Sequence, residues 1–175
     1  HRPDALPGSL RDRGGGQARN LPLPAGFHDD ELAFLLEAAV LPLIERIQPA
    51  ALVLQAGADG LADDPMSGLA LSNGGYWQAL RLVKDLAPRL IVLGGGGYNP
   101  WSVARAWVGC WGILTGREPP DVLPAEAEAL LRAITWRHSR AKAPPERWFT
   151  RLTDPPSRGP VRPEVRALPP EILRP

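Results

Sequence analysis

The sequence contains two apolar runs, Ala51-Leu-Val-Leu-Gln55 and Leu90-Ile-Val-Leu93, and each leads directly into a glycine-containing loop. Both runs have the length of a strand and are almost entirely apolar, which is typical of parallel strands that are covered on both faces. The first loop continues as Ala-Gly-Ala-Asp59 and the second as Gly-Gly-Gly-Gly-Tyr98. These two runs therefore predict neighbouring strands of a parallel sheet.

Helical patterns lie before, between and after the two predicted strands, over residues 29–47, 72–86 and 99–114. Pro42 is expected to kink the first of these helices, because proline lacks a backbone N–H. This alternation of helix and strand predicts an α/β fold with helices on both faces of the sheet. The expected N-caps are Asp29 or Asp30, Ser72 or Asn73, and Asn99.

Glycine and proline concentrate at the two ends of the chain. Residues 1–26 predict an irregular entry segment, and residues 121–175 predict one short helix, over 125–133, in a Pro-rich tail that is otherwise extended or loosely attached. We therefore divide the chain into residues 1–120 and 121–175. Two strands are too few for a complete domain of this class, so we expect the chain to be part of a larger sheet.

Composition excludes several classes of protein. The 175 residues are 44% hydrophobic and 22% charged, with a net charge of +1, which leaves no global positive field to attract nucleic acid or an anionic membrane. No apolar run approaches the roughly 18 residues that a membrane span needs. The single cysteine, Cys110, excludes an internal disulfide and a multi-cysteine metal site. It suits a reducing compartment, so we expect the protein to be cytoplasmic.

The chemistry is expected where the two predicted strands end. Parallel strands end at one edge of a sheet, and ligands bind beyond that edge, so Asp59 and Tyr98 should lie on the same edge. Position alone favours a loop-capping role for Asp59 over metal binding, and it assigns the next acids, Asp63-Asp64-Pro65, to a turn. Tyr98 is open to two interpretations, as a hydrogen-bond donor or as an aromatic cover for its loop. The glycine run lacks a phosphate-loop motif and is only a weak candidate for a phosphate cradle.

Two longer stretches resemble the zinc-dependent histone deacetylase superfamily, and most closely the bacterial acetoin-utilisation deacetylases. The first is Val53-Leu-Gln-Ala-Gly-Ala-Asp59-Gly-Leu-Ala-Asp-Asp-Pro65-Met66, and the second is Ile91-Val-Leu-Gly-Gly-Gly-Gly-Tyr98-Asn. The resemblance covers nearly the whole chain, which is similar to roughly the C-terminal half of such an enzyme. It implies the arginase–deacetylase fold, a three-layer α/β/α sandwich around a parallel sheet.

The resemblance also implies roles for individual residues. Asp59 matches a metal ligand, and Tyr98 matches the tyrosine that donates to the substrate carbonyl oxygen. Met66, Gly96 and Gly97 match positions beside the substrate tunnel. The metal would be zinc or ferrous iron, and the remaining ligands and the catalytic histidines would lie in an N-terminal half outside this chain.

The expected function is therefore metal-dependent hydrolysis of N-acetyl groups from acetyl-lysine or acetylpolyamine-type amides, with the acetylated amine as the partner. We expect neither direct nucleic-acid binding nor membrane binding, and we expect the chain alone to be inactive. The alternative is a truncated, non-catalytic α/β binding module. A phosphate or nucleotide binder built on the glycine run is the third reading.

Overall fold

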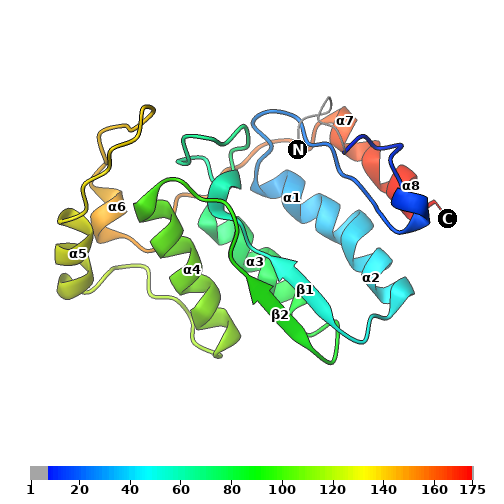
Figure 1. The fold of residues 1–175 in the computed structure, drawn as a ribbon, viewed down its shortest axis with the longest axis horizontal. Helices are drawn as coiled ribbons and strands as arrows, with labels where there is room; N and C mark the ends of the chain where they lie inside the picture. Colours follow the sequence, from blue (N-terminus) through cyan, green and yellow to red (C-terminus); the bar gives the residue numbers. More distant parts are fainter. Residues whose placement is uncertain (1–7, 175) are drawn as a thin grey trace.

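The computed structural model describes residues 8–174 and places two parallel strands at the centre of the molecule (Figure 1). Strand β1 (Leu52–Gln55) pairs with β2 (Leu90–Leu93) in a register that sets Leu52 opposite Leu90 and Gln55 opposite Leu93. The parallel pairing predicted from the two apolar runs is confirmed. The α-helices are α1 (Asp29–Leu35), α2 (Leu41–Ile47), α3 (Asn73–Val83), α4 (Pro100–Leu114), α5 (Ala125–Arg132), α6 (Arg147–Thr150), α7 (Pro163–Arg166) and α8 (Leu168–Leu173).

The helices that flank the strands begin at caps recognisable from the sequence. The Ser72 hydroxyl accepts from the N–H of Gly75 at the start of α3. The Asn99 side chain accepts from the first N–H groups of α4, whose first residue is Pro100. Both features satisfy or remove N–H groups that have no partner inside a helix.

The first predicted helix is divided in three. Its α-helical parts, α1 and α2, are joined by a π-helical turn, Leu36–Val40. Pro42 follows this turn. At the end of the turn the Leu41 N–H donates to the carbonyl of Leu36, five residues back rather than the usual four. Proline has no backbone N–H to donate within the helix, so the kink expected at Pro42 takes the form of this wider π-helical turn.

The expected cap of this helix was wrong by one residue, because α1 begins after His28. The Asp29 carboxylate instead accepts from the N–H and hydroxyl of Ser72, at 2.9 and 2.6 Å, and from the N–H of Ser157 at 2.9 Å. It therefore joins α1 to the start of α3 and to the C-terminal tail.

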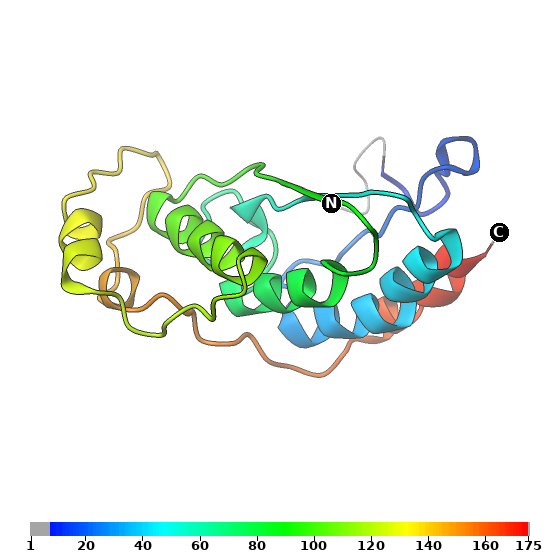
Figure 2. The same cartoon turned by 90° about the horizontal axis from the view of Figure 1, so that it is seen from below.

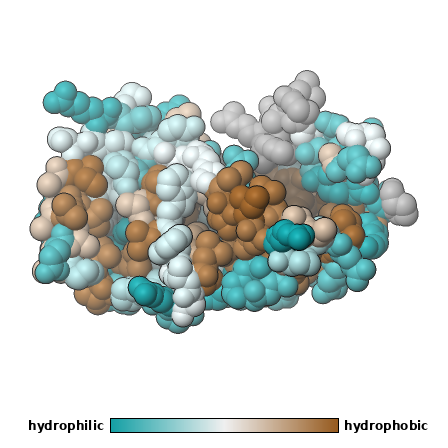
Figure 3. Space-filling model, turned by 60° about the horizontal axis from the view of Figure 1, so that its bottom comes forward, coloured by the Kyte–Doolittle hydropathy of each residue, from teal (hydrophilic) through white to brown (hydrophobic). Residues whose placement is uncertain are grey.

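The sheet is covered on one face only (Figure 2). Trp77 and Leu80 of α3, with Cys110 and Ile113 of α4, form a buried cluster against the strand residues that face the helices. The opposite face lies open to solvent, with exposed fractions of 59% for Val53, 54% for Ile91 and 50% for Leu93. The both-face coverage expected from the apolar runs is thus missing from residues 8–174, which form two layers. Hydrophobic surface is visible near the middle of the view in Figure 3.

The C-terminal tail is more ordered than its sequence suggested. The short helix predicted over 125–133 is confirmed as α5, but the rest is not loosely attached, because it contains α6, α7 and α8. Trp148 of α6 stacks on Trp101 of α4 with the ring centroids 5.5 Å apart. Val165 and Ile172, from α7 and α8, are also buried. Buried aromatic and aliphatic side chains therefore pack the C-terminal tail against the rest of the molecule, although its prolines suggested an extended chain.

Buried charges tie the same tail to α1. Glu31 is completely buried, and its carboxylate accepts from the Arg162 guanidinium at 2.6 and 2.7 Å. Burial opposes ionisation of Glu31, but the hydrogen bonds from Arg162 outweigh it and hold the pKa of this carboxyl below its usual value. The tail can be followed beneath the helices in Figure 2. Among residues 8–174, no helix has both the length and the apolar character needed to cross a membrane.

Candidate functional site

The loops that follow β1 and β2 run side by side beyond the carboxyl ends of the strands. The Ala56 N–H donates to the Leu93 carbonyl at 2.8 Å, and the Ala58 N–H donates to the Gly96 carbonyl at 2.6 Å. These bonds continue the strand pairing into the loops. The loop that carries Asp59 is thereby held against the glycine run.

Asp59 lies in a single 3-10 turn, Ala58–Gly60, and its side chain packs against Gly96. A Cβ atom at position 96 would lie 2.1 Å from Asp59 Oδ2, far inside ordinary contact distance. The carboxylate therefore occupies space that exists because residue 96 has no side chain. Asp59 is solvent-exposed in this chain, so its oxygens are free to bind a ligand.

Gly97 is required for two separate reasons. Its φ of +150° lies in a region that side-chain-bearing residues rarely adopt. A Cβ atom there would also lie 2.5 Å from Val103 Cγ2 and 3.1 Å from Ala58 Cβ. The glycine run thus packs one loop closely on the other, a role that does not depend on phosphate binding.

Tyr98 is anchored through its backbone, and its side chain is 49% exposed. Its N–H donates to Asp64 Oδ2 at 2.6 Å. The next residue, Asn99, donates from Nδ2 to the Asp63 carbonyl at 2.9 Å while it caps α4. The backbone is therefore held on both sides of the Tyr98 Cα, and the residue itself is about half exposed.

Asp64 also holds the turn that carries Met66. Its Oδ1 accepts from the Met66 N–H at 2.9 Å, so Met66 and Tyr98 are attached to the two oxygens of one carboxylate. The Met66 side chain is exposed. Sequence reasoning assigned Asp63 and Asp64 only to a turn, because it had no means of seeing a bond to a residue 34 positions away.

A second tyrosine lies beneath this loop, and sequence reasoning did not single it out. A Cβ atom at Gly60 would lie 2.4 Å from the Tyr76 hydroxyl oxygen, so this hydroxyl packs against the turn that carries Asp59. Burial raises the pKa of Tyr76 to about 12, and the negative charges of Asp59 and Asp64 add to the effect. Tyr76 is therefore a neutral group at physiological pH.

The described residues do not by themselves complete a metal site. A catalytic zinc takes about three protein ligands, whereas residues 8–174 contain no group of three His, Cys, Asp or Glu side chains arranged to hold a metal. Asp59 offers one oxygen ligand at an accessible position. The parallel strands place Asp59 and Tyr98 beyond the same sheet edge as expected, and the chemical roles of Asp59, Tyr98, Met66, Gly96 and Gly97 stay predictions.

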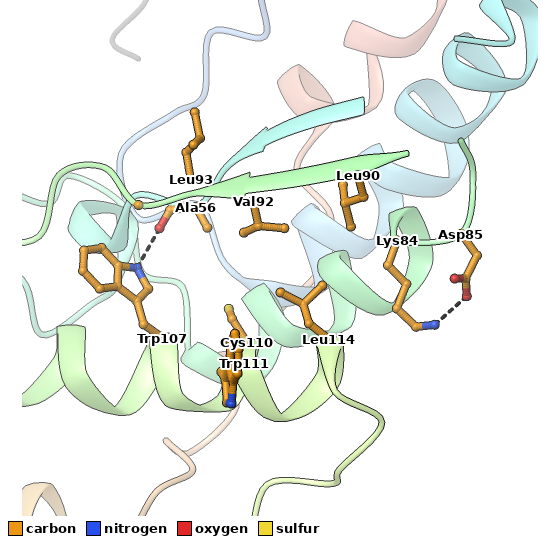
Figure 4. A pocket seen from close by; sticks show the side chains of 11 residues that line it. Ala56, Lys84, Asp85, Leu90, Val92, Leu93, Trp107, Cys110, Trp111 and Leu114 are labelled. Carbon is orange, nitrogen blue, oxygen red and sulfur yellow. Dashed lines mark hydrogen bonds and ion pairs between the residues drawn. The ribbon is translucent and has the colours of Figure 1, made fainter. Parts of the chain in front are cut away.

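A cavity of about 540 Å³ lies elsewhere, between β2 and α4 (Figure 4). Trp107 stands at one end and donates from Nε1 to the Ala56 carbonyl at 2.9 Å, and the Lys84–Asp85 ion pair stands at the other. Its remaining lining is largely apolar and includes Leu90, Val92, Cys110, Trp111 and Leu114. Asp59 and Tyr98 do not line this cavity, so it is separate from the loop site.

Comparisons with known proteins identify the family and agree with the fold. Residues 3–114 match the family described as the histone deacetylase domain. The chain is 37% identical over 121 residues to a putative histone deacetylase 2 of Caenorhabditis elegans, covering 67% of this chain and 24% of that protein. It is 39% identical over 107 residues to histone deacetylase 9 of Arabidopsis thaliana, covering 61% of this chain and 25% of that protein.

The fold is similar to a crystal structure of an HDAC homolog from Aquifex aeolicus, with a TM-score of 0.82 and 35% sequence identity. The match covers 91% of this chain and 43% of that one. An HDAC homolog complexed with SAHA matches equally well. The chain thus spans about a quarter of the length of these two curated relatives and less than half of the solved homologue.

Proposed function

Because this chain belongs to the histone deacetylase domain family, we propose that it forms one side of a deacetylase active site. The reaction is metal-dependent hydrolysis of an N-acetyl group from an acetylated amine. The observation that carries the proposal is the close packing of the two loops, which sets the Asp59 carboxylate against Gly96, two residues before Tyr98.

Each residue of the loop site has a role in this proposal. Asp59 supplies one carboxylate ligand to zinc or ferrous iron, and the other ligands come from outside the described residues. Tyr98 donates its hydroxyl proton in a hydrogen bond to the carbonyl oxygen of the amide as that oxygen gains negative charge, an interaction strongest in the transition state. Met66, Gly96 and Gly97 border the channel that receives the acyl-bearing chain.

The substrate class is part of the proposal. Acetyl-lysine and acetylpolyamine-type amides both present a secondary acetamide on a flexible chain, which suits a narrow channel that ends at the metal. The resemblance of the two loop motifs to bacterial acetoin-utilisation deacetylases supports an enzyme acting on such amides, and the single buried cysteine supports a cytoplasmic location.

The test is to fuse the chain to the part of the Aquifex aeolicus homologue that the structural match leaves uncovered. Turnover is measured on an acetyl-lysine peptide and on an N-acetylated polyamine. Tyr98→Phe is expected to lower kcat by about 10²–10³-fold with little change in KM, the usual result of removing one oxyanion donor. Asp59→Asn is expected to reduce bound metal and turnover together.

Asp85→Asn serves as the matched control, since Asp85 is an exposed acid whose ion-pair partner within residues 8–174 is Lys84. It is expected to leave turnover and metal content unchanged. An active fusion whose kcat survives Tyr98→Phe would contradict the role of Tyr98. A folded fusion that neither binds metal nor turns over would favour the non-catalytic binding module instead.

A further inference from the structure

We propose that Asp64 is a positioning residue, which sets the place of Tyr98 and Met66 in the site. The inference rests on the proposed function and extends it to a side chain with no expected contact to substrate or metal. Asp64 is 5% exposed, and each of its two oxygens accepts from one backbone N–H: Oδ1 from Met66 and Oδ2 from Tyr98.

One of these bonds is local and the other is not. An aspartate that accepts from the N–H two residues ahead is a common turn feature, so the Met66 bond alone would indicate only a stable turn. The Tyr98 bond joins two loops that are 34 residues apart, and at 2.6 Å it is short, as bonds to a charged acceptor are. It therefore couples the position of one loop to that of the other.

The neighbouring acid shows that the arrangement is specific to Asp64. The Asp63 carboxylate faces the C-terminal tail, where it accepts from the Arg147 guanidinium and from Trp148 Nε1. Two adjacent acids of equal charge thus serve different elements. Asp63 is bonded to α6, and Asp64 is bonded to the segment that carries the proposed oxyanion donor.

Tyr98 is half exposed and belongs to none of the buried hydrophobic clusters of the described residues, so the place of its ring depends largely on its backbone. Removing the Asp64 acceptor is therefore expected to shift the ring. Asp64→Asn is the sharpest change, since the amide has nearly the same shape and only one acceptor oxygen. One of the two N–H groups would then face an NH₂ donor.

The first measurement uses the 175-residue chain labelled with 3-fluorotyrosine. Its two tyrosines, Tyr76 and Tyr98, are expected to give two fluorine NMR signals, which Tyr98→Phe assigns. Asp64→Asn is expected to move the Tyr98 signal, and Asp63→Asn is expected to leave it in place. A Tyr98 signal that is identical in the wild type and in Asp64→Asn would overturn the proposal. If Asp64→Asn does not fold, Asp64→Glu replaces it, because it keeps both acceptors and displaces them by one methylene; the same shift is expected.

The second measurement is turnover of the fused enzyme. Asp64→Asn is expected to lower kcat by about 10–100-fold, the effect of displacing a reacting group by about 1 Å, with little change in KM. In a Tyr98→Phe background the same substitution should have almost no further effect. Equal losses in both backgrounds would mean that Asp64 acts on stability alone and would refute the inference. A fusion inactive in every variant refutes the proposed function instead, and the Tyr98 signal then decides the role of Asp64.

Discussion

Alanine at two adjacent glycines of the loop site should affect different properties: Gly96→Ala the proposed metal ligand, and Gly97→Ala the stability of the fold. A Cβ atom on Gly96 would overlap the end of the exposed Asp59 side chain, which is able to rotate away. A Cβ atom on Gly97 would overlap the packed Val103 side chain, in a backbone conformation of φ +150° that alanine rarely adopts. One change therefore displaces a proposed ligand, and the other strains the fold.

The magnitudes follow from these contacts. For Gly97→Ala, the backbone conformation costs about 1–3 kcal/mol and the overlap with Val103 a further 1–3 kcal/mol, so the free energy of unfolding should fall by about 2–6 kcal/mol. For Gly96→Ala, the lower chain entropy of unfolded alanine, about 0.4–1 kcal/mol, offsets the cost of moving Asp59, so stability should change by less than about 1 kcal/mol. In the fused enzyme, however, Gly96→Ala should lower turnover about 100-fold, because the carboxylate must move by about 1 Å or more.

Urea denaturation followed by tryptophan fluorescence measures the stability of both variants, and kcat is measured on the fusion. With a slope of about 2 kcal/mol per molar urea, the Gly97→Ala midpoint should fall by about 1–3 M. A Gly97→Ala protein as stable as the wild type would refute the packing described for the two loops. An active enzyme in which Gly96→Ala leaves turnover unchanged would refute the assignment of Asp59 as a ligand.

Three further outcomes are expected from the chain itself. Tyr76 should titrate with a pKa of about 12 in an ultraviolet pH titration, above the pKa of about 10 that it has in the unfolded chain. Between these two pH values only the unfolded state ionises, so the free energy of unfolding should fall as the pH rises from about 10 to about 12. Calorimetric titration with zinc should show no tight stoichiometric site, since Asp59 offers one ligand where about three are needed; tight binding abolished by Asp59→Ala would reveal further ligands. Sedimentation velocity should show self-association through the bare sheet face and strand edges, reduced by Ile91→Lys; a monomer at all concentrations would contradict this reading of the exposed face.

The elements that the sequence predicts correctly are those encoded by neighbouring residues. An apolar run of strand length marks β2, and Asn99 followed by Pro100 marks the start of α4, because a cap acts on N–H groups two or three residues away. The parallel order then places Asp59 and Tyr98 at one edge. These inferences needed no knowledge of distant contacts.

The features that the sequence does not reveal depend on partners far along the chain. Asp29 looks like a helix cap, but its carboxylate accepts hydrogen bonds from the backbone N–H groups of Ser72 and Ser157. Asp64 looks like a turn residue, and its bond to Tyr98 becomes visible only when the two loops meet. The proline-rich tail looks unattached because its anchors, such as Trp148, are single residues without periodicity.

The pairing of the first helix with the last segment of the chain has a consequence for how the protein is made. Glu31 emerges from the ribosome 131 residues before Arg162, an interval of about 7–26 s at roughly 5–20 residues per second. A buried carboxylate without its partner is strongly destabilising, so α1 has to remain in water during this time. Helix α1 therefore reaches its final place only after Arg162 has been synthesised, and until then its apolar face is available to chaperones.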